Sequence, residues 1–206
     1  MKILALADIH GQIQTIPRLS NAARDCDAIV LAGDITDFGG PDQAVSVLSA
    51  FSDLGIPVLG VTGNCDGPHV DDALGQQGNS LIQESVEING FTFVGFPYSA
   101  SNDSELNVPV HLTAISDNKK VLVTHQPAWG TRVDLQASTR HKGSRAVRFF
   151  IEDHQPVLAI SGHIHEARGI DQIGSTVLVN PGPFRNGCYA VIDLSDGAVR
   201  PRLHYI

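Results

Sequence analysis

The chain is poor in cysteine and has no paired cysteine motif. Its three cysteines, Cys26, Cys65 and Cys188, lie far apart in the sequence. This spacing excludes a disulfide framework and a zinc-ribbon motif. Isolated thiols are typical of a reducing compartment, and we therefore expect a cytoplasmic protein.

Long apolar runs are missing as well. No segment approaches the roughly 18 apolar residues that a membrane span requires. The run Ile3–Ala7 begins like a signal peptide, but Asp8 and His10 interrupt it too early for the apolar region of one. The sequence therefore predicts a protein without a membrane partner.

Positive charge is scarce. Lys and Arg number 14 against 22 Asp and Glu, which gives a net charge of −8. Because proteins that follow long nucleic acids normally present a basic face, this balance weighs against nucleic acid as a partner. An anionic substrate would need a local attraction, such as bound metal ions.

The chain has no linker, repeat or low-complexity tract. With 206 residues and 42% hydrophobic residues, it is long enough to bury a substantial core. We expect a single domain over residues 1–206.

Short apolar runs alternate with helix-period segments through the first three quarters of the chain. Runs that are apolar nearly throughout predict strands buried on both faces of a sheet. The predicted strands are Ile3–Ala7, Ala28–Ala32, Pro57–Thr62, Val121–Thr124 and Val157–Ser161.

Helical spacing of apolar residues predicts helices over Pro41–Leu54 and Lys142–Asp153, with a weaker one around Ile16–Ala23. The helix over Lys142–Asp153 is expected to bury Ala146, Phe149 and Phe150 and to expose its arginines. Asn89-Gly90 within Ser80–Gly95 is a strong hairpin signal. Further strands are expected at Thr176–Val179, Tyr189–Leu194 and Val199–Ile206. The pattern predicts an α/β protein with a β-rich end.

Metal-ligating side chains follow each of the five buried runs. In chain order they are Asp8 and His10, Asp34, Asn64 and Asp66, His125, and His163 and His165. In an open α/β sheet the functional crevice lies outside the carboxyl ends of the strands. Glycines at 33, 63 and 162 allow sharp turns there. Nitrogen and oxygen donors without a thiolate suit borderline divalent metals.

Each motif is a weak signal when it is taken alone. Gly-Asp and Gly-Asn-x-Asp are common turn sequences, and a lone histidine such as His125 is more often an ordinary strand-end residue. The interpretation therefore depends on the order and placement of all five motifs together.

This order of motifs resembles the calcineurin-like metallophosphoesterase family, in the form of its small bacterial and archaeal phosphodiesterases. The resemblance spans Asp8 to His165, and the turn Asn180-Pro181-Gly182 also fits. It implies a four-layer α/β sandwich of two mixed sheets with helices outside. It also implies hydrolysis of phosphomonoester or phosphodiester bonds of a small substrate, through a dinuclear metal centre and a metal-activated water.

The resemblance implies two divalent metal ions, with Mn²⁺ favoured and Fe, Zn or Ni as alternatives. Asp34 would bridge the two ions. The other ligands would be Asp8, His10 and His165 for the first ion, and Asn64, His125 and His163 for the second.

Catalytic roles fall on Asp34, Asn64, Cys65 and Asp66, and we interpret Asp66 and Asp37 as orienting the ligands. Many family members carry histidine where this chain has Cys65, and that histidine is thought to protonate the leaving oxygen. Because a thiol is a poorer acid near neutrality, we expect a preference for good leaving groups.

Two other functions remain open: a nuclease acting on polynucleotides, and a noncatalytic scaffold for protein binding. A second open question concerns Arg140, His141 and Arg145, which either form an anion-binding rim or are solvated charges. An exposed final strand could pair between subunits, so a homo-oligomer is a further possibility.

Overall fold

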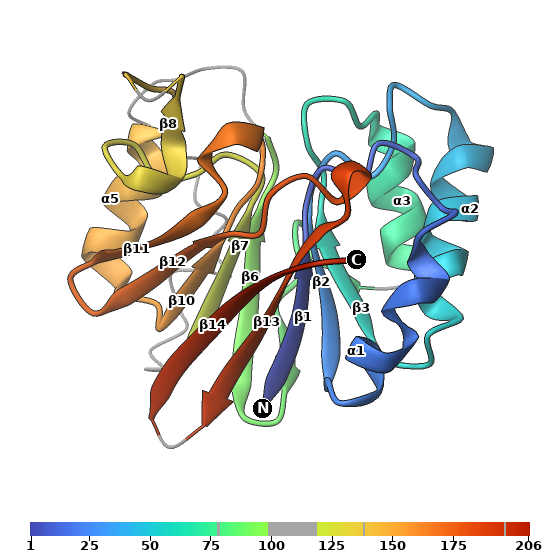
Figure 1. Cartoon of the computed structure of the whole chain (residues 1–206), viewed down its shortest axis with the longest axis horizontal. Coiled ribbons are helices and arrows are strands. Elements are labelled where there is room, and N and C mark those ends of the chain that lie inside the picture. The colour runs from blue at the N-terminus through green and yellow to red at the C-terminus, as the bar shows by residue number, and fades with distance from the viewer. Residues whose placement is uncertain (78, 99–118, 138, 196) are drawn as a thin grey trace.

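The computed structural model describes residues 1–77, 79–98, 119–137, 139–195 and 197–206. Two six-stranded mixed sheets face each other, and helices cover their outer sides (Figure 1). This is the four-layer α/β sandwich that the family resemblance predicts. No helix in the described ranges is long and apolar enough to cross a membrane.

The first sheet has the strand order β14-β13-β1-β2-β3-β4. Strands β1 to β4 are parallel, whereas β13 and β14 extend the sheet with antiparallel pairing. The bounds are β1 Lys2–Leu6, β2 Ala28–Ala32, β3 Val58–Val61, β4 Asn79–Ser80, β13 Cys188–Ser195 and β14 Ala198–Tyr205.

The second sheet has the order β11-β12-β10-β7-β6-β5. Its four central strands are parallel and its two edge strands are antiparallel. The bounds are β5 Val86–Ile88, β6 Phe91–Phe96, β7 Lys120–Thr124, β10 Leu158–Ile160, β11 Gly169–Ile173 and β12 Thr176–Asn180. Asn89 and Gly90, both with positive φ, form the predicted hairpin turn between β5 and β6.

Helices α1, α2 and α3 lie outside the first sheet, and α5 lies outside the second (Figure 1). Their bounds are α1 Ser20–Arg24, α2 Pro41–Ser52, α3 Pro68–Gln77 and α5 Arg145–His154. Short 3₁₀ turns are η1 Ile16–Leu19, η2 Arg132–Asp134, η3 His165–Ala167 and η4 Phe184–Asn186. A small hairpin pairs β8 Leu135–Gln136 with β9 Arg140–His141.

Helix α5 corrects one expectation. Phe149 is 53% exposed, whereas Ala146, Val147, Phe150 and Ile151 are buried. Adjacent helical residues point about 100° apart, so a stripe at helical spacing that includes Val147 and Phe150 turns Phe149 outward. The helix begins after Ser144, whose side chain accepts a hydrogen bond from the Val147 amide as an N-cap.

The central strands are buried on both faces, and their side chains alternate between two cores. In β1, Leu4 and Leu6 pack against the helices, whereas Ile3 and Ala5 belong to the core between the sheets. That inter-sheet core also contains Val30 of the first sheet and residues from several strands of the second. Burying a large aliphatic side chain contributes about 1.5–3 kcal/mol, so this shared core holds the two sheets face to face.

The carboxyl ends of the parallel strands lie at one end of this sandwich. The N-terminus marks the lower end of β1 in Figure 1, so the strands end at the top of that view. The five strands that precede the candidate donors are divided between the sheets, with β1, β2 and β3 in one and β7 and β10 in the other.

Candidate metal centre

Hydrogen bonds link the strand ends across the two sheets. The His163 amide, after β10, donates to both carboxylate oxygens of Asp8, after β1, at 3.2 Å. The His125 ring, after β7, bonds through Nδ1 to the carbonyl of Ala32 in β2 at 2.8 Å. The donors thus converge because the two sheets face each other, although the strands are not all neighbours.

Backbone strain is concentrated at the same positions. Asp8, His10, Asp34 and His163 have φ values of 54°, 47°, 50° and 68°, in the left-handed region. A non-glycine residue in such a conformation costs about 1–3 kcal/mol and clusters at functional sites. The surrounding fold therefore maintains unfavourable conformations at four candidate ligands.

The three glycines of the motifs provide space as well as turns. Only Gly33 has a positive φ, of 82°. A β-carbon at Gly63 would lie 2.2 Å from Asp34 Oδ1, and one at Gly162 would lie 2.8 Å from Asp8 Oδ2. At positions 63 and 162, glycine is thus required for the close approach of a carboxylate.

A first group of donors consists of Asp8, His10 and His165, each offering one atom within 4.8 Å of the others. Asp8 is fully buried, and its Oδ1 lies 3.2 Å from His165 Nε2. Within the described residues, both ring nitrogens of His10 are buried without a hydrogen-bond partner. Because unpaired buried polar atoms are costly, this histidine fits a metal ligand.

A second group consists of Asp8, Asp34 and His125, all buried. Asp34 Oδ2 lies 3.4 Å from His125 Nε2 and 3.7 Å from His10 Nε2, so this carboxylate lies next to a histidine of each group. The His125 Nδ1–H donates to a backbone carbonyl, and this fixes the tautomer that presents Nε2 to a cation. Asn64 Oδ1 lies 3.1 Å from the same Nε2.

The close packing of Asp34 and His125 shifts the pKa values of both groups in the metal-free site. Burial alone would raise the pKa of Asp34, but the hydrogen bond and charge of His125 and the Cys65 amide lower it well below its usual range. Burial would lower the pKa of His125, yet the hydrogen bond and charge of Asp34 raise it. In the metal-free site, His125 therefore holds its proton to a higher pH than a free histidine does, beside an ionised Asp34.

His163 lies next to the second group but is not one of its members. Its ring lies 5.0 Å from the His125 ring, centroid to centroid, and 5.6 Å from the Tyr98 ring. The pKa of His163 is lowered to about 4, by burial first and then by the charge of His125. It adjoins the second group, but its nitrogens belong to none of the described clusters of three converging donors.

Cys65 and Asp66 lie beside the donors in different environments. The Cys65 Sγ converges with His10 and Asp34 within 4.8 Å, and its pKa is raised to about 12 by burial and then by the charge of Asp34. The Asp66 carboxylate accepts from the amides of Ile35, Thr36 and Gly63 at 2.8–3.0 Å. It therefore joins the loops after β2 and β3 and positions the donors.

The remaining candidates lie around the centre. Asp37 is exposed, and its Oδ1 is 3.3 Å from His10 Nδ1. Arg140 and His141 are exposed in β9. His141 pairs with buried Asp134 at 2.7 Å, and Arg145 covers the Trp129 ring at 4.2 Å. These contacts tie both side chains to the loop before α5, and the anion-binding rim stays a prediction.

Arg185 was not predicted as a site residue from the sequence. It lies in η4, after the Asn180-Pro181-Gly182 turn, and its amide donates to the Asp8 carbonyl at 3.2 Å. Its Nη2 lies 3.3 Å from His165 Nδ1. The Asn180-Pro181-Gly182 turn could have pointed to Arg185, because it returns the chain to the end of β1.

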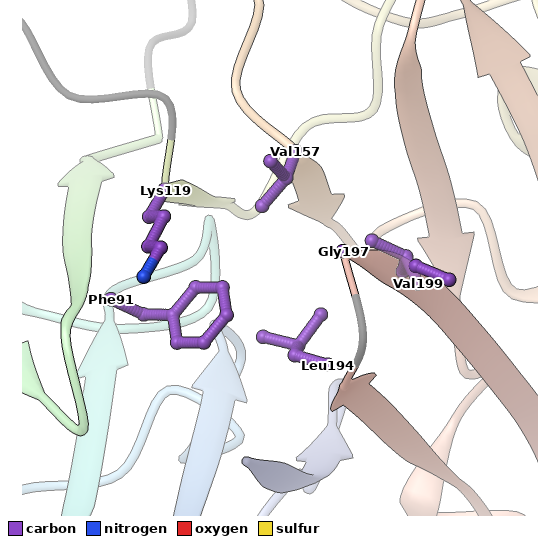
Figure 2. A pocket seen from close by; sticks show the side chains of 7 residues that line it. Phe91, Lys119, Val157, Leu194, Gly197 and Val199 are labelled. Carbon is purple, nitrogen blue, oxygen red and sulfur yellow. The ribbon is translucent and has the colours of Figure 1, made fainter.

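Two of the hollows in the described part of the molecule lie at different ends. A hollow of about 220 Å³ adjoins Cys65 and is lined by Phe38, Asn64 and His69 among others. A larger one, of about 360 Å³, lies at the amino ends of β6, β7 and β10, and its walls are mainly apolar (Figure 2). The larger hollow is therefore at the opposite end from the donors.

A sandwich of this kind with buried carboxylates and histidines at one end is typical of a metal-dependent hydrolase. A profile of the calcineurin-like phosphoesterase superfamily domain matches residues 1–197. The chain is also 33% identical over 198 residues to the uncharacterized protein MJ1162 of Methanocaldococcus jannaschii, covering 89% of this chain and 88% of that one. The chain belongs to the calcineurin-like phosphoesterase superfamily and is a hydrolase of phosphoric ester bonds.

Solved structures share the fold at lower identity. The crystal structure of TT1561 of Thermus thermophilus has a TM-score of 0.78 and 18% identity, over 98% of this chain and 97% of that one. Purple acid phosphatase PPD1 from yellow lupin, Lupinus luteus, has a TM-score of 0.67 and 11% identity, over 100% of this chain and 51% of that one. These likenesses show a common architecture.

Proposed function

We propose that the chain hydrolyses small phosphate monoesters or diesters at a dinuclear divalent-metal centre. The main support is the meeting of buried donors at one end of the two sheets. In the described ranges, the ion pairs of Asp8 and Asp34 are with histidines alone. Buried carboxylates require a compensating cation, and a pair of metal ions supplies it.

The donor geometry supports a division between two ions. Asp34 is the bridging carboxylate, since its Oδ2 lies close to His10 of the first group and to His125 of the second. The ligands of the first ion are Asp8, His10 and His165, and those of the second are Asn64, His125 and His163. Mixed nitrogen and oxygen donors suit Mn²⁺, Fe, Zn or Ni, and Mn²⁺ is the ion that we propose.

The side chains around the metals prepare the substrate. When bound, divalent cations polarise the phosphoryl group and lower the pKa of a bound water. If His165 binds a cation through Nε2, its Nδ1 carries the proton and stops accepting from Arg185. The Arg185 guanidinium is then free for a phosphoryl oxygen. Cys65, with its raised pKa, retains its proton near neutral pH.

We further propose a reducing, cytoplasmic location. The three cysteines are all free and buried, which fits thiols that stay reduced. Nothing in the charge balance favours a long nucleic acid, so a small phosphate ester is the proposed substrate.

The test is reconstitution of the metal-free protein with single divalent metals, followed by assays on a panel of phosphate esters. Wild-type protein should gain activity, with Mn²⁺ the most effective. Asp34→Asn removes the bridging charge and should abolish turnover with every metal, while circular dichroism stays unchanged. Substantial turnover by Asp34→Asn would refute the bridging role, and cleavage of DNA alone would favour a nuclease.

A further inference from the structure

Phe38, beside the candidate centre, combines an exposed side chain with a strained backbone conformation. Its side chain is 77% exposed, the highest value among the exposed large hydrophobic residues in the described ranges. Its φ of 54° places it in the left-handed region, like four of the candidate ligands, although it has no donor atom. Such strain persists only where the surrounding structure imposes it.

Hydrogen bonds on both sides of Phe38 impose this conformation. The Phe38 amide donates to the Cys65 carbonyl at 3.0 Å. Thr36, two residues before Phe38, donates through its amide and its hydroxyl to Asp66 at 2.8 and 2.9 Å. The Gly39 carbonyl pairs with His69 Nε2 at 2.8 Å. The segment that carries Phe38 is thus tied to the loop after β3 at several points.

The exposed ring borders the hollow of about 220 Å³ that opens beside Cys65. His69 lies on the same hollow, and Gly67 allows its ring to lie close, because a β-carbon there would be 2.6 Å from His69 Cε1. Cys65 lines the hollow, and its Sγ lies within 4.8 Å of a donor atom of His10 and of Asp34. An aromatic group in this hollow would contact the Phe38 ring and the His69 imidazole. The phosphate ester attached to that group would then reach the candidate metal ligands.

We propose that this hollow is the leaving-group subsite and that Phe38 stacks on the aromatic ring of an aryl phosphate ester. The inference rests on the proposed phosphoesterase function and adds a substrate class to it. Stacking of flat rings on an aromatic side chain stabilises binding independently of leaving-group acidity. Phe38 is therefore a specificity-determining residue.

Ligand binding and ester hydrolysis both test the proposed leaving-group subsite. Benzylphosphonate is a phenyl phosphate analogue whose methylene prevents hydrolysis, and cyclohexylmethylphosphonate has similar size but no flat ring. Calorimetry on the metal-loaded protein should give benzylphosphonate the lower Kd. Phe38→Leu should remove about tenfold of that preference, and Phe149→Ala, which deletes an exposed phenylalanine on α5, should preserve it.

The kinetic comparison uses phenyl and hexafluoroisopropyl esters of methyl phosphate, whose leaving groups have similar acidity. Phe38→Leu should lower kcat/KM for the phenyl ester about tenfold and leave the fluoroalkyl ester within about twofold. Equal losses on both esters, or wild-type protein without preference for benzylphosphonate, would overturn the subsite. Failure of wild-type protein to hydrolyse either ester would instead count against the proposed function, and the phosphonate preference would still decide the subsite.

Discussion

At the scale of single side chains, we expect Cys65 to influence which phosphate esters the proposed centre cleaves. Cys65 occupies the position where many family members are thought to use histidine as the acid for the leaving oxygen. Burial and the charge of Asp34 hold the pKa of the thiol at about 12, so it donates its proton poorly. Esters with acidic leaving groups need that proton least and should react best.

Replacing Cys65 with histidine should therefore help poor leaving groups most. General acid catalysis contributes roughly 10²–10⁴-fold, so kcat/KM for alkyl esters should rise by about tenfold or more, with little change for nitrophenyl esters. Rates for Cys65→His and the control Cys65→Ala across a leaving-group series measure this. A uniform effect along the series would argue against Cys65 as the acid position.

The sequence allowed most donors to be predicted, because they follow recognisable strands in short motifs. Asp8-x-His10 and His163-x-His165 are local patterns. Arg185 and Phe38 could not be found this way. The roles proposed for them depend on contacts with His165 and Cys65, which lie far away in the sequence.

Tight loops between elements bring the donors together. Asp66 joins the loops after β2 and β3, and Gly63 lets the Asp34 carboxylate pass close to the backbone. The sequence indicated glycines for turning, whereas positions 63 and 162 need them for space. This distinction depends on what lies opposite each glycine in the folded chain.

Gly63→Ala should disturb the centre. A β-carbon there would lie 2.2 Å from Asp34 Oδ1 and 2.3 Å from the Asp34 backbone nitrogen, so the carboxylate and the backbone that carries it must both move. Loss of ligand orientation typically costs about 10–100-fold in metal affinity. Calorimetric Kd values for Mn²⁺ measure this, with Gly40→Ala as the matched control, because nothing lies within 4 Å of its β-carbon. Equal affinities for the two variants would contradict the steric role of Gly63.

The elements themselves were predictable where their apolar pattern is strong. The buried strands and α2 lie close to their predicted ranges. Helix α3 was missed because it buries few residues, Val70, Ala73 and Leu74, and carries Gly75. Phe149 was wrongly expected to be buried, because the buried stripe of α5 consists of Ala146, Val147, Phe150 and Ile151 and leaves Phe149 on the opposite side.

At the scale of the whole molecule, the site depends on two sheets meeting face to face. Strand periodicity cannot show which sheet a strand joins, and the two-sheet arrangement was expected from the family resemblance alone. The shared inter-sheet core joins the described strands of both sheets, and one domain over residues 1–206 stays a prediction. The core also brings the end of β7 against β2, where His125 meets Asp34.

Metal binding should be coupled to proton release from this inter-sheet site. The pKa of His125 is raised by Asp34 in the metal-free protein, so the proton is held to a higher pH than on a free histidine. The cation must displace it, and metal affinity should therefore fall as pH falls through that pKa. Calorimetry in buffers of different ionisation enthalpy measures the protons released. His154→Gln should not change that number, and no release from wild-type protein would contradict the coupling.

The central claim is that the converging donors hold two metal ions on either side of Asp34. Anomalous X-ray scattering from crystals loaded with Mn²⁺ tests it most directly. The account predicts two peaks about 3.5–4 Å apart, one beside Asp8, His10 and His165 and the other beside Asn64, His125 and His163. A single peak, or peaks away from Asp34, would contradict it.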